Sequence, residues 1–178
     1  MAAASSQAVI LGIKVHSSDG LTLMKSALRE CSRLVKPAAI SSVYRIESEA
    51  EVNAHVHDLR SYAVFEGLVL ALNGFTALSP TELAKQLRVA EDEFRNEALR
   101  QSVSVSLNFY GTSTLMTPNL TLPDPDFHLR PENVLPAAEI SPEFVHPVLQ
   151  KTLRELARPF VSTPWGEFVA QGKAMLDF

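Results

Sequence analysis

The chain of 178 residues lacks several features that would assign it at once to a class of protein. Cys31 is its one cysteine, so an internal disulfide is excluded and a reducing compartment such as the cytoplasm is expected. No run of about 18 apolar residues is present, which argues against a membrane-spanning helix. Basic residues are not in excess, since the net charge is -4, and the sequence therefore predicts no binding to nucleic acid.

Nothing in the sequence divides the chain into separate domains. It has no internal repeat, low-complexity tract or Gly/Ser linker, and its length suits one domain with a substantial core. Residues 1–7 are small and polar and predict a disordered leader. Residues 158–178 form a tail that carries Phe160, Trp165 and Phe168, more aromatic surface than a free tail needs. We expect this tail to pack back over the domain or to dock on another chain.

Hydrophobic periodicity and turn residues predict alternating strands and helices. Strands are expected at 8–15, 39–46, 62–72 and 101–110, and helices at 21–34, 79–98, 131–138 and 147–157. The clearest helix start is Ser79 followed by Pro80 and Glu82, a predicted capping box. This order of elements predicts an α+β fold, in which a ferredoxin-like antiparallel sheet is covered by helices in a single-domain sandwich.

The strand at 101–110, reading QSVSVSLNFY, is the most informative part of the sequence. Its strict alternation predicts one apolar face, formed by Val103, Val105, Leu107 and Phe109, which we expect to pack on the core. The opposite face carries Ser102, Ser104, Ser106, Asn108 and Tyr110. A solvated polar face and a hydroxyl-lined binding surface are the two interpretations of these residues.

Several short motifs in a fixed order resemble those of the 6-hydroxymethyl-7,8-dihydropterin pyrophosphokinase family. They are VILG at 9–12, ISSVYR at 40–45, SPTEL at 79–83, LTLP at 120–123 with a following Arg130, and PAAEISPE at 136–143. The resemblance covers residues 8–157, which we take as the pterin pyrophosphokinase-like domain. It implies the fold of a folate-pathway enzyme that transfers pyrophosphate from ATP to a pterin with the help of magnesium ions.

The same resemblance implies that the catalytic chemistry of this chain has changed. The two aspartates that hold magnesium in the family correspond to Ser104 and Ser106, and its ATP-contacting histidine corresponds to Asp124. A neutral hydroxyl does not neutralise phosphate charge as a metal-binding carboxylate does, and Asp124 would repel a triphosphate. Arg130 matches the family's nucleotide-contacting arginine, and Arg100 lies beside the place of a phosphate-binding one. These two arginines are the predicted remnant of a nucleotide site.

Four residues are candidates for a pterin pocket. The resemblance places Glu66 near an asparagine that binds the pterin edge and Glu132 where an aromatic ring stacks on the pterin, while Tyr44 and Arg45 end the second strand. A carboxylate at Glu66 could accept two hydrogen bonds from such a ring. The alternatives are that Glu66 pairs with Arg45 or is exposed at a sheet edge, and that Glu132 pairs with Arg130.

Metal-binding signals are weak. Asp124 and Asp126 alternate in a proline-rich turn and resemble cation ligands only superficially, and His55 and His57 in a loop fall short of a metal site. No metal and no cofactor are therefore expected, and Mg and ATP would be needed only by an active enzyme.

Three functional hypotheses follow. The first is a catalytically degraded homologue of the pterin pyrophosphokinase, retained as a module that binds a pterin-like small molecule or assembles with a protein partner through its tail. The second is an active ATP-dependent diphosphokinase with metal ligands relocated to Asp124 and Asp126. The third is a structural subunit of a homo-oligomer. A pair of carboxylates facing the vacated pocket is the feature that discriminates the first two.

Overall fold

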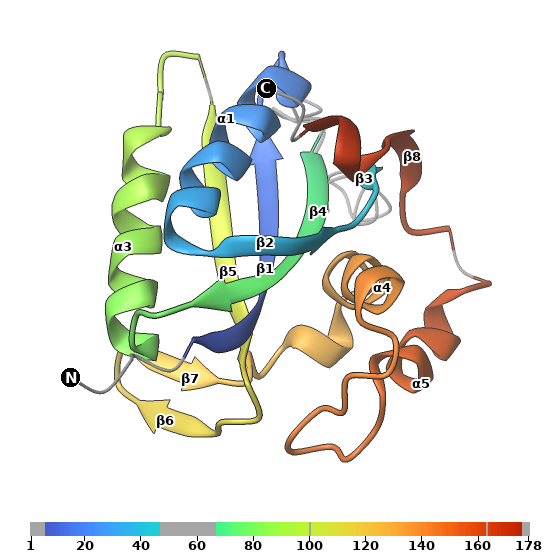
Figure 1. Cartoon of the computed structure of the whole chain (residues 1–178). Helices are drawn as coiled ribbons and strands as arrows, with labels where there is room; N and C mark the ends of the chain where they lie inside the picture. Colours follow the sequence, from blue (N-terminus) through green and yellow to red (C-terminus); the bar gives the residue numbers. More distant parts are fainter. Residues whose placement is uncertain (1–5, 47–66, 100, 163, 176–178) are drawn as a thin grey trace, which may run out of the picture.

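A six-stranded antiparallel sheet is the centre of the molecule, with helices on both of its faces (Figure 1). The computed structural model describes residues 6–46, 67–99, 101–162 and 164–175. The first half contains β1 (Gln7–His16), α1 (Gly20–Leu34), β2 (Lys36–Ile40), β3 (Val43–Ile46), β4 (Gly67–Thr76), α3 (Pro80–Glu93) and β5 (Ser102–Tyr110). The second half contains β6 (Leu115–Thr117), β7 (Leu120–Leu122), η1 (Phe127–Leu129), α4 (Pro131–Ile140), α5 (Leu153–Ala157), η2 (Arg158–Phe160), β8 (Glu167–Ala170) and η3 (Gly172–Met175).

The strand order confirms the predicted fold class. The strands lie in the order β5-β1-β4-β3-β8, and every pairing is antiparallel. β2 and β3 pair with different parts of the same edge of β4. Without β8, and with β2 and β3 counted as one interrupted strand, this is the strand, helix, strand, strand, helix, strand arrangement of a ferredoxin-like fold. The hairpin of β6 and β7 forms a separate two-stranded sheet. No helix among the described residues is long and apolar enough to cross a membrane.

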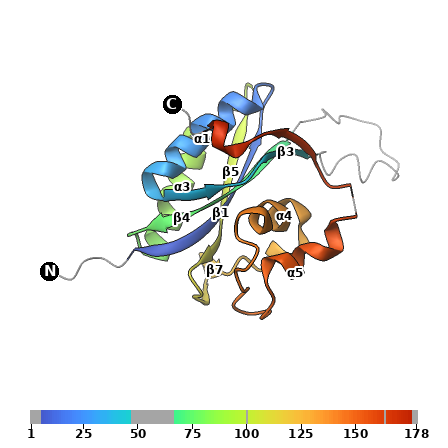
Figure 2. The same ribbon diagram turned by 45° about the vertical axis from the view of Figure 1, so that its right-hand side comes forward.

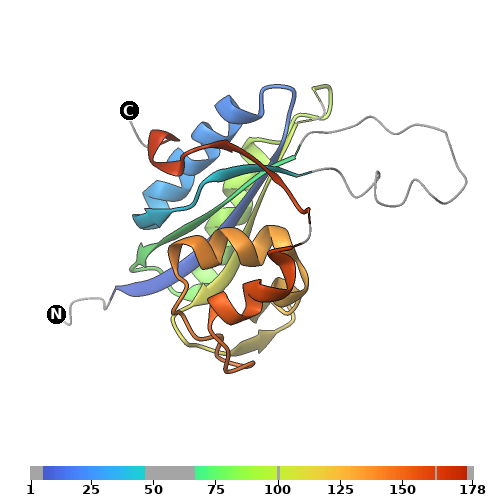
Figure 3. The same cartoon turned by 90° about the vertical axis from the view of Figure 1, so that its right-hand side faces the viewer.

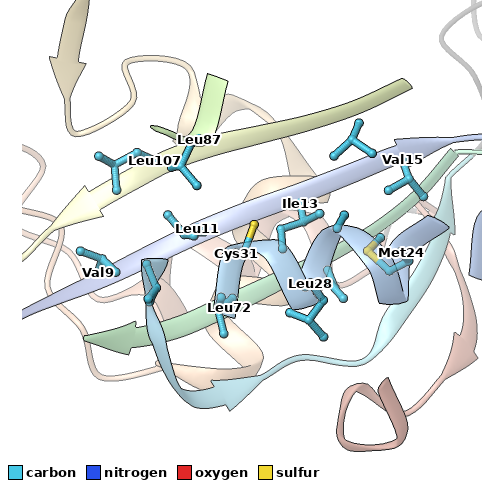
Figure 4. Close-up of a cluster of buried hydrophobic side chains, with 14 of the residues drawn as sticks. Val9, Leu11, Ile13, Val15, Met24, Leu28, Cys31, Leu72, Leu87 and Leu107 are labelled. Carbon is cyan, nitrogen blue, oxygen red and sulfur yellow. The ribbon is translucent and has the colours of Figure 1, made fainter. Parts of the chain in front are cut away.

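Each face of the sheet is covered by a different helical layer, as Figure 2 shows from the side. On one face, α1 and α3 bury an apolar cluster that includes Leu11, Ile13, Leu28, Cys31 and Leu72 (Figure 4). On the other, α4 and α5 pack over a smaller cluster around Phe109 and Phe127. Burial of each large aliphatic side chain contributes about 1.5–3 kcal/mol, so the larger cluster dominates the stability of the fold. Burial also raises the pKa of the Cys31 thiol to about 12.

The helix starts follow local chemistry, with one difference from expectation. Asp19 caps α1 by accepting a hydrogen bond from the Thr22 backbone N–H at 3.3 Å. Ser79 caps α3 by accepting from the Glu82 N–H at 3.3 Å, as predicted, but the Glu82 carboxylate accepts from Gln86. A reciprocal capping box, which was not predicted from the sequence, is present instead at α5 between Thr152 and Glu155.

Several predicted boundaries are wrong. The strand expected at 39–46 is divided into two short strands, β2 and β3, because the strand conformation is interrupted at Ser41 and Ser42. The helix expected to reach residue 98 ends at Glu93, and the helix expected over 147–157 is confined to α5. Gln7, assigned to the leader, already belongs to β1, and residues 1–5 lie outside the described part of the chain.

The C-terminal segment returns to the sheet, which is one of the two arrangements expected for the tail. β8 pairs with β3 at the sheet edge, and Met175 is buried in the larger cluster. Gly172 is packed so closely that an added Cβ would lie 2.0 Å from the Ser41 carbonyl oxygen. Residues 167–175 of the tail are therefore an integral part of the sheet and of the larger cluster beside it, although Phe168 remains exposed.

Candidate functional site

A polar pocket of about 200 Å³ lies on the face of the sheet that carries α4. Strands β1, β4 and β5 form its floor, and the start of α4 with the turn before it forms its wall. Its polar lining residues include Lys14, Ser104, Ser106, Asp124, Asp126, Arg130, Glu132 and Asn133. The pocket thus brings together the serine positions of β5 and most of the sequence-predicted residues near the LTLP motif.

The serine face of β5 forms as predicted up to Leu107 and then changes. Lys14 is the cross-strand neighbour of Ser104, and Gly12 is the neighbour of Ser106. Beyond Leu107 the register shifts, because Leu107 pairs with Leu11 while Phe109 pairs with Ile10, and Asn108 is left without a partner in the ladder. A β-bulge of this kind re-aims the side chains that follow it.

Because of the bulge, Phe109 and Tyr110 face the sides opposite to those predicted, whereas Asn108 stays on the same face as Ser106. Phe109 packs in the cluster under α4 and α5 rather than under α1, and Tyr110 belongs to the opposite cluster. Asn108 is fully buried, and both polar atoms of its amide lack a hydrogen-bond partner among the described residues. An added Cβ at Gly12 would lie 2.7 Å from Ser106 Oγ and 3.1 Å from Asn108 Nδ2, so glycine is required for this close approach.

Lys14 lines the pocket but was not predicted from the sequence as a site residue. Its Nζ lies 3.4 Å from Glu132 Oε1, and the two side chains are 26% and 16% exposed. Arg130 Nη1 lies 3.9 Å from the same carboxylate oxygen, so the predicted pairing of Arg130 with Glu132 is present in a loose form. The signal for Lys14 was its spacing, since Gly12, Lys14 and His16 alternate with the apolar residues of β1.

Asp124 and Asp126 both line the pocket, at a turn that follows the cis Leu122–Pro123 peptide bond. Hydrogen bonds hold both the backbone and the side chain of Asp124 in place. Its backbone N–H donates to the Asn108 carbonyl at 3.1 Å, and its Oδ1 accepts from the Asp126 backbone N–H at 2.9 Å. Among the residues that the structure describes, no group of three or more His, Cys, Asp or Glu side chains is arranged to hold a metal ion.

Tyr44 and Arg45, two of the pterin-pocket candidates, do not line this pocket. The Tyr44 hydroxyl donates to Glu139 Oε2 at 2.8 Å, and the Tyr44 ring lies 4.7 Å from the Trp165 ring, between centroids. Burial and the Glu139 carboxylate raise the pKa of Tyr44. Arg45 pairs with the exposed Glu167 of β8 at 3.1 Å. The returning tail therefore contacts both residues.

Glu66, Arg100, His55 and His57 lie outside the described residues. The structure therefore unites Ser104, Ser106, Asp124, Arg130 and Glu132 in one pocket, adds Lys14 and Asp126, and separates Tyr44 and Arg45 from them.

Sequence comparisons support a relationship to known enzymes, although no family model matches the chain. The 2-amino-4-hydroxy-6-hydroxymethyldihydropteridine pyrophosphokinase of Synechocystis sp. is 36% identical over 84 residues, which are 45% of this chain and 43% of that protein. The enzyme of the same name from Aquifex aeolicus is 26% identical over 151 residues, which are 83% of this chain and 88% of that protein. The Synechocystis match thus spans less than half of the relative.

Solved structures share the fold. A crystal structure of the Plasmodium falciparum HPPK-DHPS triple mutant with SDX-DHP superposes with a TM-score of 0.69 at 13% identity, covering 89% of this chain and 45% of that one. A structure of HPPK-DHPS in complex with substrates gives 0.68 at 11% identity, covering 87% and 43%. The motifs, the fold and the two named relatives agree in relating this chain to the 2-amino-4-hydroxy-6-hydroxymethyldihydropteridine pyrophosphokinase family.

Proposed function

We propose that this protein is a non-catalytic pterin pyrophosphokinase homologue that binds a pterin-like small molecule in the pocket on β1 and β5. The observation that carries the proposal is the position of the Lys14 ammonium. Lys14 lies directly across the strand pair from Ser104, in the pocket where the resemblance expects two aspartates and their magnesium ions. A side-chain cation held by Glu132 thus accompanies the loss of both carboxylates.

The residues of this pocket do not fit a pair of magnesium ions. Mg²⁺ requires near-octahedral oxygen ligands, chiefly carboxylates and waters. Ser104 and Ser106 offer neutral hydroxyls, and Lys14 would repel a divalent cation beside them. Pyrophosphoryl transfer relies on metal ions and arginines to neutralise the charge that develops on the phosphates, so we derive no catalytic step for this site.

Binding is a role for which the pocket retains suitable groups. Lys14 and Asn133 can donate hydrogen bonds, and the Glu132 carboxylate can accept them. The ring edge of a pterin presents both amide donors and acceptors, and the relatives are named for a pterin substrate. Because charges of both signs line the pocket, a neutral heterocycle suits it better than a triphosphate.

One observation favours a second candidate, an active diphosphokinase with relocated metal ligands. Asp124 and Asp126 both line the pocket beside Ser106, which is the pair of carboxylates that this hypothesis requires. Against it, Asp124 already accepts a hydrogen bond from the Asp126 backbone through Oδ1, and Asp126 is exposed. Two carboxylates in one exposed turn form a weak cation site.

An assay of the purified protein with magnesium, ATP and 6-hydroxymethyl-7,8-dihydropterin separates the two candidates. We expect no magnesium-dependent AMP above the background without protein, while the Aquifex aeolicus enzyme serves as the positive control. In parallel, calorimetric titration with 6-hydroxymethylpterin should detect binding that Glu132→Gln weakens. AMP formation that is abolished by Asp124→Asn would establish the second candidate, and absence of both turnover and pterin binding would refute the proposal.

A further inference from the structure

The polar pocket has two ends along β5, and they differ in chemistry. At one end, Lys14 lies across the strand pair from Ser104. The other end is at Ser106, where the pocket meets the turn after the β6–β7 hairpin, toward the lower end of the molecule in Figure 3. Asp124 in this turn is tied to that end, because its backbone N–H donates to the Asn108 carbonyl at 3.1 Å. Two residues of a strand span about 7 Å, so the two ends contact different parts of a ligand.

Three side chains at the Ser106 end can exchange hydrogen bonds with a ligand. The Ser106 hydroxyl donates to the Gly12 carbonyl at 3.4 Å, a long and therefore weak bond, and its oxygen can accept. Asp124 accepts from the Asp126 backbone N–H through Oδ1, and its second carboxylate oxygen can accept from a ligand. Ser106 and Asp124 are half-buried and Asp126 is exposed, and all three line the pocket. A molecule in the pocket can therefore reach each of them.

Hydroxyl groups match this end better than an anion or an apolar chain does. A hydroxyl donates its proton to a carboxylate, and its oxygen accepts from another donor. Asp124 and Asp126 would repel a phosphate or a carboxylate, and an apolar chain would cover the carboxylates without satisfying them. A chain with several hydroxyl groups can engage the serine and both carboxylates, whereas a single hydroxyl group can reach only part of this set.

We propose that the pocket selects a pterin that carries an uncharged polyhydroxyalkyl side chain, whose hydroxyl groups bind to Ser106, Asp124 and Asp126. This inference rests on the proposed pterin binding, in which the Lys14–Glu132 pair at the opposite end takes the ring edge. It adds the kind of substituent that the site prefers. In the competing arrangement, the two aspartates hold a magnesium ion, and that ion contacts the hydroxyl groups in their place.

Two pterins that differ only in the side chain test the proposal on the full chain. Neopterin carries a trihydroxypropyl chain, and 6-methylpterin carries a methyl group on the same ring. Both are titrated by calorimetry, first with EDTA and then with Mg²⁺. We expect neopterin to bind about tenfold more tightly in EDTA, because each added hydrogen bond to a partly exposed group contributes modestly. In NMR spectra, neopterin should shift the amides of Ser106 and Asp126 more than 6-methylpterin does.

Substitutions along β5 and its neighbouring turn locate this preference. The combined Ser106→Ala and Asp126→Ala variant should bind the two pterins with about equal affinity. It retains the Asp126 backbone N–H from which Asp124 accepts, so the turn keeps its hydrogen bond. Ser106→Ala alone should reduce the ratio to about threefold. Ser102→Ala is the matched control on the same polar face of β5 but outside the pocket lining, and it should keep the tenfold ratio.

The possible outcomes separate this inference from the proposed function. Equal affinities of the unmodified protein for the two pterins would overturn the inference and leave pterin binding intact. Binding of neither pterin would refute the proposed function and the inference together. A neopterin preference that appears only with Mg²⁺ would assign the hydroxyl groups to a bound ion and overturn the direct contacts. A tenfold ratio that survives in the combined variant would show that the hydroxyl groups bind elsewhere.

Discussion

The two faces of strand β1 show how one short sequence serves two purposes. On the side of α1 and α3, Leu11, Ile13 and Val15 are at most 1% exposed and form part of the main core. On the other side, Gly12 and Lys14 line the polar pocket. The apolar face contacts residues that any ferredoxin-like sheet would bury, whereas the polar face depends on Glu132, which is 118 residues away along the chain. The larger apolar cluster therefore lies on one face of β1 and the polar pocket on the other.

The sharpest contrast between the faces should appear in stability. Leu28→Ala removes a fully buried side chain from the main core and should lower the free energy of unfolding by about 2–5 kcal/mol. Ser104→Ala on the exposed pocket face should change it by less than about 0.5 kcal/mol. Urea denaturation of both variants measures the difference. Comparable losses would mean that the pocket face is also essential to the fold.

A smaller loss is expected when the pair inside the pocket is broken. Lys14→Met leaves the Glu132 carboxylate, which is 16% exposed, with the Arg130 contact at 3.9 Å among the described residues, and should cost about 1–3 kcal/mol. The combined Lys14→Met and Glu132→Leu variant should recover part of this loss.

The exposed Arg33–Glu30 pair on α1 is the matched control. Arg33→Met should cost less than about 1 kcal/mol, because that arginine is 67% exposed. A double-mutant cycle in urea gives both coupling energies. Equal coupling in the two pairs would show that Lys14 is an ordinary surface cation.

Acid should destabilise the pocket side of the sheet through two histidines. Burial lowers the pKa of His146, helped by His128, and burial with Lys14 lowers the pKa of His16. Below about pH 6.5 the unfolded chain binds protons that the folded protein excludes, so stability is full above that pH and falls as the pH drops through the lowered folded values. The loss is at most about 1.4 kcal/mol per pH unit for each histidine.

Midpoints of urea unfolding, measured from about pH 7.5 to about pH 5.5, test this expectation, because that range spans the unperturbed pKa of histidine. His146→Asn should show a flatter pH dependence than the unmodified protein, and Lys14→Met should reduce the contribution of His16. An unchanged slope in His146→Asn would contradict the assignment of a neutral buried His146.

The smallest effect is expected from restoring the family's aspartates. Ser104→Asp with Ser106→Asp should leave the protein without turnover, because Lys14, Asp124 and Glu132 still line the pocket. Two carboxylates at i and i+2 repel each other, but Lys14 lies opposite position 104 and offsets part of that cost, so we expect a change in stability of about 1 kcal/mol or less. AMP formation near the rate of an ordinary relative would show that only the two metal ligands were missing.

The sequence predicted the layered fold because periodicity and capping are local signals. It failed where the structure depends on pairing between distant strands. The alternation in β5 holds as far as Leu107 and then breaks at Asn108, because the bulge arises from the register with β1. Likewise, the short β8 becomes a strand only because β3 offers it a free edge.

The candidate site was predicted in part for the same reason. Motif order located Ser104, Ser106, Asp124, Arg130 and Glu132, and the structure unites these residues. Lys14 was overlooked although the alternation of β1 places it beside Gly12, because its meaning depends on Glu132 at the start of α4. The Tyr44 ring contacts the ring of Trp165 from the tail, and no local sequence pattern predicts that contact.

Line broadening by Mn²⁺ in NMR spectra shows whether a metal ion binds beside Ser104 and Ser106, because this ion replaces Mg²⁺ and relaxes nearby nuclei. NMR spectra of the protein with ATP, recorded as Mn²⁺ is added, report which amides lie near a bound ion. We expect the amides of Ser104 and Ser106 to broaden no more than the amides of exposed residues such as Arg33. Preferential broadening of the Lys14, Ser104 and Ser106 amides at low Mn²⁺ would place a metal ion in the pocket and contradict the proposal of a site without magnesium.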